Sequence, residues 1–251
     1  MKKKVCAFTI ADDNNKKYLS MMRSSLRRWH DADELPLIEI VNPELSNTLK
    51  VDPEFFYRAT PTVAAQLIDS YETVIKIDAD SIITAPINEA WEGDHDVKVV
   101  LNSNPREVKQ YPVSVLDLHP VQQYVNCGFV AMRSKEFVEH WLQLCMSPHF
   151  HSYQFREQDL LNILVHYGNY NCELLDNGTG FWGLSSKGYW TDIQLKDDQL
   201  VLPANTEWNK SDKIIRVIHW AGGNTPNKMN VHVRFQEDVA KWLNNLTKPI
   251  A

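Results

Sequence analysis

The chain has 251 residues, of which 43% are hydrophobic and 23% charged, and its formal net charge is −6. This composition is that of an ordinary globular protein and excludes disordered and fibrous chains. The acidic balance argues against nucleic acid as a partner, because a duplex attracts clustered Lys and Arg. At about 150 residues per domain, the length is sufficient for one large domain.

The first apolar run, Val5–Ile10, follows three lysines, as the core of a signal peptide would. It ends before Asp12 and is shorter than the roughly 7–15 apolar residues of such a core, so it predicts a first strand. No stretch approaches the about 20 apolar residues of a transmembrane segment. The four cysteines lack C-x-x-C spacing, which predicts reduced thiols and a cytoplasmic location.

Apolar periodicity predicts the remaining elements in chain order. A helix is expected over Lys16–His30 and a strand over Leu37–Val41. Thr60 and Pro61 resemble an N-cap and a proline at the first helical position, so the next helix is expected to begin there and to include Val63–Ile68. Later strands are predicted over Thr73–Ile77, Val97–Leu101, Gly128–Met132 and Ile214–Ile218, and later helices over 137–144, 160–164 and 235–246. This alternation predicts an α/β fold with a largely parallel sheet.

Two carboxylates, Asp78 and Asp80, directly follow the predicted strand Thr73–Ile77. Ligands of open α/β sheets bind at the carboxyl ends of the strands. Oxygen ligands in that position suit Mg²⁺ or Mn²⁺ shared with substrate phosphates. A D-x-D sequence can equally end a strand in a solvated turn, and the spacing alone does not decide between the two readings.

A second strand end carries a potential metal ligand, His219, followed by Gly222 and Gly223. The glycine backbone could wrap a diphosphate. Taken alone, this segment is better interpreted with His219 as a hydrogen-bonded strand-end histidine. Together with Asp78 and Asp80 it would form a three-residue metal site with open positions for phosphate oxygens.

Four motifs, in this order, resemble those of nucleotide-sugar glycosyltransferases of the GT-A fold. They are Ile77-Asp78-Ala79-Asp80, Asn126-Cys127-Gly128-Phe129-Val130-Ala131-Met132, Glu157-Gln158-Asp159-Leu160-Leu161-Asn162, and His219-Trp220-Ala221-Gly222 with Pro226. The chain is most similar to glycosyltransferase family 8, the retaining group that includes glycogenin-like and lipopolysaccharide galactosyl- and glucosyltransferase-like enzymes.

The resemblance implies a single GT-A domain over 1–251, Rossmann-like, with a nucleotide-binding part at about 1–102 and an acceptor-side part at about 103–251. It also implies a reaction. A sugar would pass from a nucleoside-diphosphate sugar, expected to be a UDP-sugar, to a hydroxyl of a carbohydrate or other acceptor. Mn²⁺ or Mg²⁺ would assist, and the anomeric configuration would be retained.

The resemblance further implies a role for each matching position. Asp80 and His219 would ligate the metal, and Asp78 would be a ligand or a ribose contact. Gln158 and Asp159 would lie beneath the donor sugar as the catalytic candidates, because a nearby carboxylate or amide oxygen stabilises oxocarbenium-like charge. The other donor-binding candidates are Thr9, Ile10, Ala11 and Asp12 for the nucleoside, with Arg58, Ala79, Asn126, Gly128, Gly222 and Lys228.

Some positions depart from the family pattern or have a second reading. The family's lysine after the histidine-glycine segment is replaced by Thr225, and Lys228 could reach the same diphosphate. Arg58 lies about one helical turn further from Asp78 than the pattern suggests. The acids around Gln158 could also simply favour the N-terminal dipole of a helix, and this does not exclude the catalytic role.

Two other functions are compatible with parts of this pattern. A phosphatase of the haloacid dehalogenase type also has D-x-D after an apolar strand and uses the first Asp as a nucleophile. That strand usually lies near the N-terminus, and His219-x-x-Gly has no role in such an enzyme. A non-catalytic sugar- or nucleotide-binding module would not need Asp78, Asp80 and His219 to converge on one ion.

Overall fold

The structure is a computed structural model. The residues it describes are 2–13, 15–41, 55–101 (backbone alone at 55–57), 124–153, 155–175, 192–204, 211–219 and 235–249. Two of the predicted donor-binding residues, Gly222 and Lys228, lie outside these ranges.

A six-stranded sheet forms the centre of the molecule, in the order β2-β1-β3-β6-β5-β7. Its strands are β1 (Lys3–Ala11), β2 (Leu37–Val41), β3 (Tyr71–Ile77), β5 (Val97–Leu101), β6 (Val125–Met132) and β7 (Cys172–Leu174). Strand β1 is parallel to β2 and β3, and β5 is parallel to β7. Strand β6 runs antiparallel to both of its neighbours. The sheet is therefore mostly parallel, as predicted.

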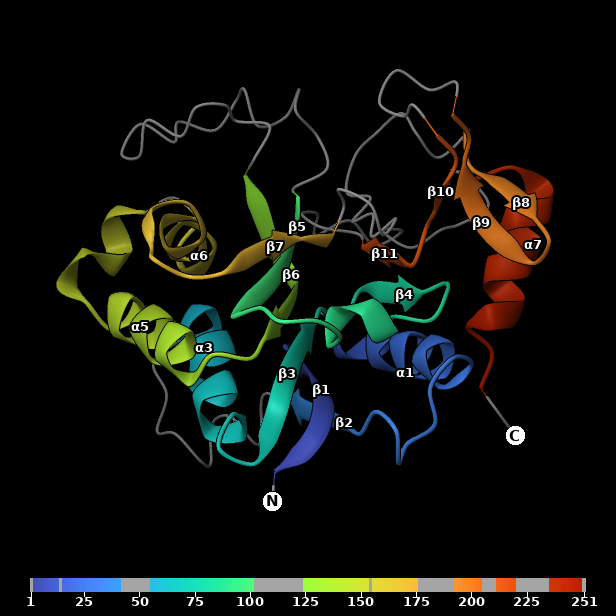
Figure 1. The fold of residues 1–251 in the computed structure, drawn as a ribbon. Coiled ribbons are helices and arrows are strands. Elements are labelled where there is room, and N and C mark those ends of the chain that lie inside the picture. Colours follow the sequence, from blue (N-terminus) through green and yellow to red (C-terminus); the bar gives the residue numbers. More distant parts are fainter. Residues whose placement is uncertain are drawn as a thin grey trace.

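Helices cover both faces of this sheet (Figure 1). They are α1 (Leu19–Arg27), preceded by the 3-10 turn Lys16–Tyr18, and α3 (Phe55–Leu67), α5 (Lys135–Cys145) and α6 (Glu157–Tyr167). Helix α7 (Glu237–Leu246) lies beside the smaller sheets instead. Alternate residues of β1 separate the two layers, since successive strand residues point to opposite faces. Cys6 and Phe8 pack with α3, α5 and α6, whereas Val5 and Ala7 pack with α1.

Two small antiparallel sheets lie beside the central one. Strand β4 (Ser81–Ile83) pairs with β11 (Val217–His219), and β9 (Gln199–Leu202) lies between β8 (Gln194–Lys196) and β10 (Lys213–Ile214). Apolar residues of these strands pack against α7. The predicted strand Ile214–Ile218 is therefore divided between two small sheets.

The predicted start of the second helix is wrong. Helix α3 begins at Phe55, and Pro61 lies inside it. Proline removes one helical N–H donor, which makes it typical of a first turn. Here Ala59, which precedes the proline, is fully buried in the same core as Val63 and Ala64, and its burial favours a helix that continues on the N-terminal side of Pro61.

The cysteines agree with the prediction of reduced thiols. All four cysteines are free thiols.

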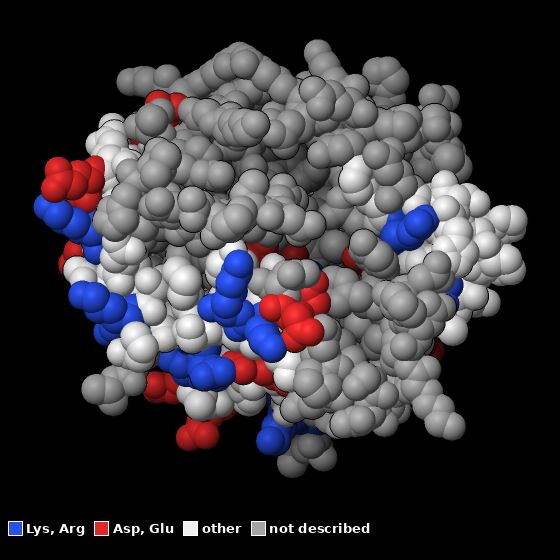
Figure 2. Space-filling model, turned by 180° about the vertical axis from the view of Figure 1, so that it is seen from behind, with Lys and Arg blue, Asp and Glu red and all other residues white. Residues whose placement is uncertain are grey.

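Within the described part of the chain, no helix has both the length and the apolar character that a membrane span requires. Figure 2 shows Lys and Arg side chains interspersed with Asp and Glu over the described residues of one face. Ion pairs such as Arg23–Glu39, 2.5 Å apart, add to this mixing of charges.

Candidate metal and donor site

The two predicted metal-binding segments meet through the pairing of β4 with β11. Strand β3 ends at Ile77, and Asp78–Asp80 form the turn into β4, in which the Ser81 N–H donates to the Asp78 carbonyl at 3.1 Å. In the antiparallel register Ser81 lies opposite His219. Residues more than 130 positions apart are thus brought to one place.

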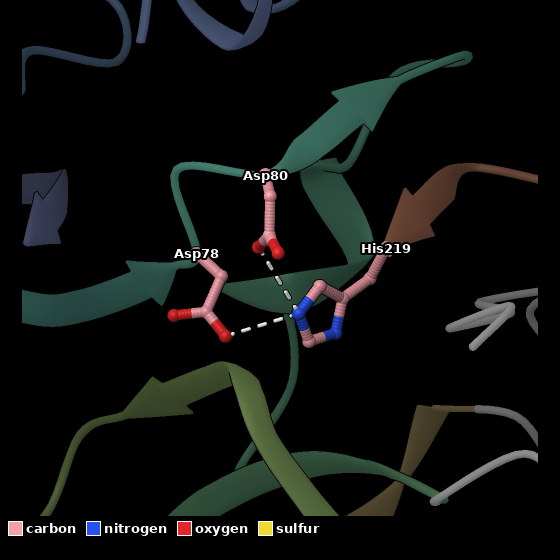
Figure 3. A group of neighbouring side chains, drawn as sticks. All are labelled: Asp78, Asp80 and His219. Atoms are coloured by element: carbon pink, nitrogen blue, oxygen red, sulfur yellow. Dashed lines mark ion pairs between the residues drawn. The ribbon is translucent and has the colours of Figure 1, made fainter. Parts of the chain in front are cut away.

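Asp78, Asp80 and His219 point toward one another (Figure 3). The Nε2 atom of His219 lies 3.1 Å from Asp78 Oδ2 and 3.3 Å from Asp80 Oδ1. One ligand atom from each residue lies within 4.8 Å of the others. His219 and Asp80 are buried, whereas the Asp78 side chain is 30% exposed. The group is therefore compact and partly open to solvent.

The charges of this group are strongly coupled. Burial would lower the pKa of His219, but the carboxylates of Asp80 and Asp78 raise it to about 9. Burial would raise the pKa of Asp78, but the Lys76 ammonium and His219 hold it well below its usual range. Asp78 is therefore ionised at neutral pH, as a metal ligand must be.

Lys76 is a member of this site that the sequence analysis did not identify. Its side chain is only 5% exposed, and its Nζ donates to the Asp78 carboxylate and, at 2.8 Å, to the Cys127 carbonyl. The available signal was a single charged residue inside the otherwise apolar run Val74–Ile77. A lysine so deeply buried needs paired oxygen atoms.

Strand β6 supplies the opposite wall through an irregularity in its pairing with β5. Val99 pairs with Val130, but the next residue, Val100, pairs with Asn126. The residues between them on β6 include Gly128, whose carbonyl accepts the Asp78 N–H at 2.8 Å. Such irregularities redirect backbone groups at functional sites.

The close packing around Gly128 leaves no room for a side chain at this position. A Cβ atom at this position would lie 2.2 Å from His219 Cε1 and 2.6 Å from Asn126 Oδ1. The Asn126 Oδ1 atom accepts the Gly128 N–H at 2.6 Å. The structure therefore places Gly128, a predicted donor-binding residue, against His219. Asn126, a second predicted donor-binding residue, is hydrogen-bonded to Gly128.

Gln158 and Asp159 lie in the first turn of α6 and join it to β6. Gln158 Oε1 accepts the Cys127 N–H at 3.1 Å, and its Nε2 donates to the Tyr124 hydroxyl at 3.3 Å. Asp159 accepts from the Tyr124 hydroxyl at 2.5 Å and from the Phe155 N–H at 2.8 Å. Both side chains thus have a structural role, and their catalytic role stays a prediction.

Glu157, beside these two residues, is a second member that the sequence analysis did not assign. Its Oε2 atom is buried and has no hydrogen-bond partner among the described residues. Burial raises the pKa of this carboxyl to about 8, so it is mostly protonated at neutral pH. The Cys127 thiol lies 3.8 Å from its Oε1. The first turn of α6 contains both Glu157 and Asp159, but a protonated Glu157 brings no negative charge to the helix dipole.

The end of β1 lies against the D-x-D turn. Ala11 packs with Ala79 and Leu19 in one small apolar cluster. Thr9 is fully buried, and its hydroxyl has no hydrogen-bond partner within the described residues. Ile10 is buried in the central core, and the Asp12 carboxylate accepts the Asn15 N–H at 2.8 Å. The predicted nucleoside-binding segment is therefore next to Ala79, and its role stays a prediction.

Arg58, the remaining predicted donor-binding residue of the described chain, contacts an aromatic ring. It belongs to α3, and its guanidinium stacks over the Phe150 ring with 4.6 Å between Cζ and the ring centroid. A guanidinium on an aromatic face is a stabilising arrangement in its own right. Its predicted contact with a donor is not tested by these observations.

The comparisons with known proteins identify the fold. No protein-family model matches the sequence, and no curated protein matches it. Among solved structures, the chain is similar to glycosyltransferases. The galactosyltransferase LgtC, solved with donor and acceptor sugar analogues, has 15% identity and a TM-score of 0.58, over 96% of this chain and 95% of that chain.

Two further structures extend this likeness. The bifunctional glycosyltransferase WbbM has 15% identity and a TM-score of 0.58 over 94% of this chain, which spans only 52% of the WbbM chain. A glycosyltransferase involved in glycosylation of the major capsid of PBCV-1 has 10% identity and a TM-score of 0.57, over 92% of this chain and 99% of that chain. The predicted α/β GT-A fold is confirmed, because similarity at these identities establishes fold.

Proposed function

We propose that this protein is a metal-dependent glycosyltransferase that moves a sugar from a nucleoside-diphosphate sugar to a hydroxyl acceptor. The observation that carries the proposal is the convergence of Asp78, Asp80 and His219 at the carboxyl end of β3. In open α/β folds this edge is where nucleotides bind. The fold shared with several glycosyltransferases supports the same reaction class.

The side chains present fit a divalent cation. Asp80 and His219 would hold it, with Asp78 Oδ2 as the third ligand, and these atoms are close enough to share one ion. Two carboxylate oxygens and one imidazole nitrogen suit Mn²⁺, since Mg²⁺ favours oxygen ligands alone. When bound, the metal would neutralise charge on the diphosphate leaving group.

The sugar and nucleoside are assigned to the walls of the same site. A UDP-sugar is the proposed donor, with its nucleoside at Thr9–Asp12 and its diphosphate near Gly222 and Lys228. The donor sugar would lie over β6 at Asn126 and Gly128, with Gln158 and Asp159 beneath it. Carboxylate and amide oxygens in that position would stabilise positive charge at the anomeric carbon. A carbohydrate or another hydroxyl compound would be the acceptor.

Retention of the anomeric configuration, membership of family 8 and a family-like set of donor contacts form the finer part of this proposal. They rest on the motif order in the sequence. The product configuration separates retention from inversion directly, because the first-formed anomer can be observed by NMR before mutarotation. An inverted first product would contradict retention and leave the transferase assignment intact.

The two alternative functions are less well supported. A phosphatase of the haloacid dehalogenase type requires its first aspartate to attack a phosphorus atom. Here one oxygen of Asp78 is held by Lys76 and the other faces His219, so neither oxygen is positioned as a free nucleophile. A simple binding module gives no reason for three potential metal ligands to meet.

The test is a screen of nucleotide sugars with Mn²⁺, Mg²⁺ or EDTA, in which nucleoside diphosphate release is measured. We expect one donor to be turned over with a divalent cation and not in EDTA. Asp80→Asn and His219→Ala should lose more activity than the about 10–100-fold that outer-sphere partners of a metal cost. Asp69→Asn is the control, since Asp69 is exposed and pairs with Lys135. Unchanged turnover in EDTA, or by either ligand variant, would refute the metal-dependent reaction.

A further inference from the structure

The Tyr124 hydroxyl lies between the two catalytic candidates, Gln158 and Asp159. Its oxygen is 2.5 Å from Asp159 Oδ1 and 3.3 Å from Gln158 Nε2. Tyr124 is only 2% exposed, so both hydrogen bonds form away from solvent. Buried polar groups need partners within the protein, and the donors and acceptors at hand therefore decide the direction of each hydrogen bond.

A backbone N–H, which can only donate, fixes each end of this chain of hydrogen bonds. The Cys127 N–H lies 3.1 Å from one end of the Gln158 amide, and that end must therefore be Oε1. The other end is the NH₂ group, which donates to the Tyr124 oxygen. The Phe155 N–H occupies Asp159 Oδ2, which leaves Oδ1 to accept the Tyr124 hydroxyl proton. The hydrogen bonds thus run in one direction, from Gln158 through Tyr124 to Asp159.

The two candidates differ in what they can still offer to a substrate. Asp159 is 7% exposed, and each of its oxygens already accepts a hydrogen bond. Among the described residues, Gln158 Oε1 accepts from the Cys127 N–H, and a carbonyl oxygen has a second lone pair. Cys127 is also the neighbour of Gly128, which packs against His219. Gln158 is therefore the candidate with an oxygen left over beside the metal site.

We propose that Tyr124 is a positioning residue that aims the Gln158 amide oxygen at the donor sugar, and that Asp159 holds Tyr124. This inference rests on the proposed function and divides the work of its two catalytic candidates. Gln158 would face the anomeric carbon, whereas Asp159 would act only through Tyr124. Without the hydroxyl the amide is free to turn, and a displacement of about 1 Å at a reacting centre can cost about 100-fold in rate.

Hydrogen exchange followed by NMR tests the orientation in the protein without ligands. In the wild type the Cys127 N–H should be protected, because it donates to Gln158. Tyr124→Phe removes the anchor of the amide, so this N–H should exchange roughly fivefold faster or more. The Val125 N–H is the internal control. It donates to Asn162 Oδ1 at 2.7 Å and should keep its wild-type exchange rate.

Turnover tests the role in the reaction. The probe is the most active nucleotide sugar of a panel that contains UDP-glucose and UDP-galactose, assayed with Mn²⁺. Tyr124→Phe should lower kcat at least about tenfold and change the donor KM less than about twofold, since the aimed oxygen acts on charge that develops in the transition state. Tyr170→Phe is the matched control. It also removes a hydroxyl, one that lies 3.0 Å from His140 Nδ1, and should keep the wild-type kcat.

Two double variants test whether these residues act as one unit, because the effects of such residues are not additive. In the Gln158→Ala background, Tyr124→Phe should cause no further loss of kcat. In the Tyr124→Phe background, Asp159→Asn should also cause no further loss, since asparagine keeps an acceptor for the Phe155 N–H.

The outcomes distinguish this inference from the proposed function. An unprotected Cys127 N–H in the wild type, or an unchanged exchange rate in Tyr124→Phe, would overturn the orienting role. An unchanged kcat in Tyr124→Phe, or a full further loss in either double variant, would overturn the division of roles. Each of these results leaves the transferase proposal standing. If the wild-type protein turned over no nucleotide sugar, the proposed function would be contradicted, and this inference with it.

Discussion

Replacing Gly128 with alanine adds a single methyl group to the wall of the metal site. The new Cβ would lie 2.2 Å from His219 Cε1, 2.5 Å from His219 Nδ1 and 2.6 Å from Asn126 Oδ1. Carbon atoms in contact are normally about 3.5–4.0 Å apart, so the imidazole would have to move by more than about 1 Å. The side chain of His219 is buried, which limits where the ring can go.

The expected effects follow from that displacement. Overpacking in a well-packed region costs about 1–3 kcal/mol, so the variant should remain folded but less stable. Metal sites tolerate ligand displacements of only about 0.2 Å. A shift of about 1 Å should therefore lower the Mn²⁺ affinity measured with UDP by at least about tenfold and lower donor turnover with it.

The assay combines urea unfolding, Mn²⁺ titration and a double-mutant cycle. In the His219→Ala background the added methyl loses its closest neighbours, so the destabilisation by Gly128→Ala should be smaller by about 0.5 kcal/mol or more. Some cost should persist, because the contact with Asn126 Oδ1 remains. This coupling between Gly128 and His219 is the signature of the overlap.

Cys127→Ala is the control, because it changes the neighbouring residue and only removes atoms. It should keep the wild-type Mn²⁺ affinity. If Gly128→Ala instead binds Mn²⁺ as the wild type does, or if its stability cost is the same with and without the imidazole, then the close packing of Gly128 against His219 is not what fixes the site.

Two further predictions concern stability away from the metal ligands. Burial lowers the pKa of His95 to about 4, and among the described residues its ring nitrogens have no hydrogen-bond partner. Because the unfolded histidine takes up a proton below about pH 6.5 and the folded one does not, the free energy of unfolding should fall between pH 6.5 and 4, by at most about 3 kcal/mol. This component should vanish in His95→Phe, and a variant with the full wild-type pH dependence would contradict it. Asn162 makes three hydrogen bonds, to the Val125 N–H, the Val125 carbonyl and the Gln158 carbonyl. Asn162→Leu should lower the urea-derived stability by about 2–4 kcal/mol, since it leaves buried backbone groups unpaired, and a change below about 0.5 kcal/mol would contradict this.

Local sequence patterns were sufficient to predict most elements of the central sheet. The runs that become β1 and β3 are continuous and apolar, which is typical of strands buried on both faces. The direction of β6 could not be predicted, because the segment between β5 and β6 gives no signal of how the chain returns. The predicted start of α3 was wrong because the local proline signal was outweighed by the burial of Ala59, which lies before the proline.

The sequence was sufficient to predict that His219 approaches Asp78 and Asp80. It was not sufficient to predict which strands bring these residues together. The family resemblance suggested one shared cation, but the antiparallel pairing of β4 with β11 depends on short strands with little periodicity. The irregularity in β6 was equally hidden, since it depends on the register between two strands and not on either sequence alone.

The backbone of Cys127 connects two parts of the site, and a motif of side chains cannot indicate such a connection. Its carbonyl accepts from Lys76, which holds Asp78, and its N–H donates to Gln158. One backbone residue therefore joins the candidate metal ligands to the residue proposed to lie beneath the donor sugar. A side-chain substitution at Cys127 leaves both hydrogen bonds in place, whereas a change in the register of β6 would move the two halves of the site together. The geometry of the proposed reaction therefore depends on the irregular pairing of β6 with β5.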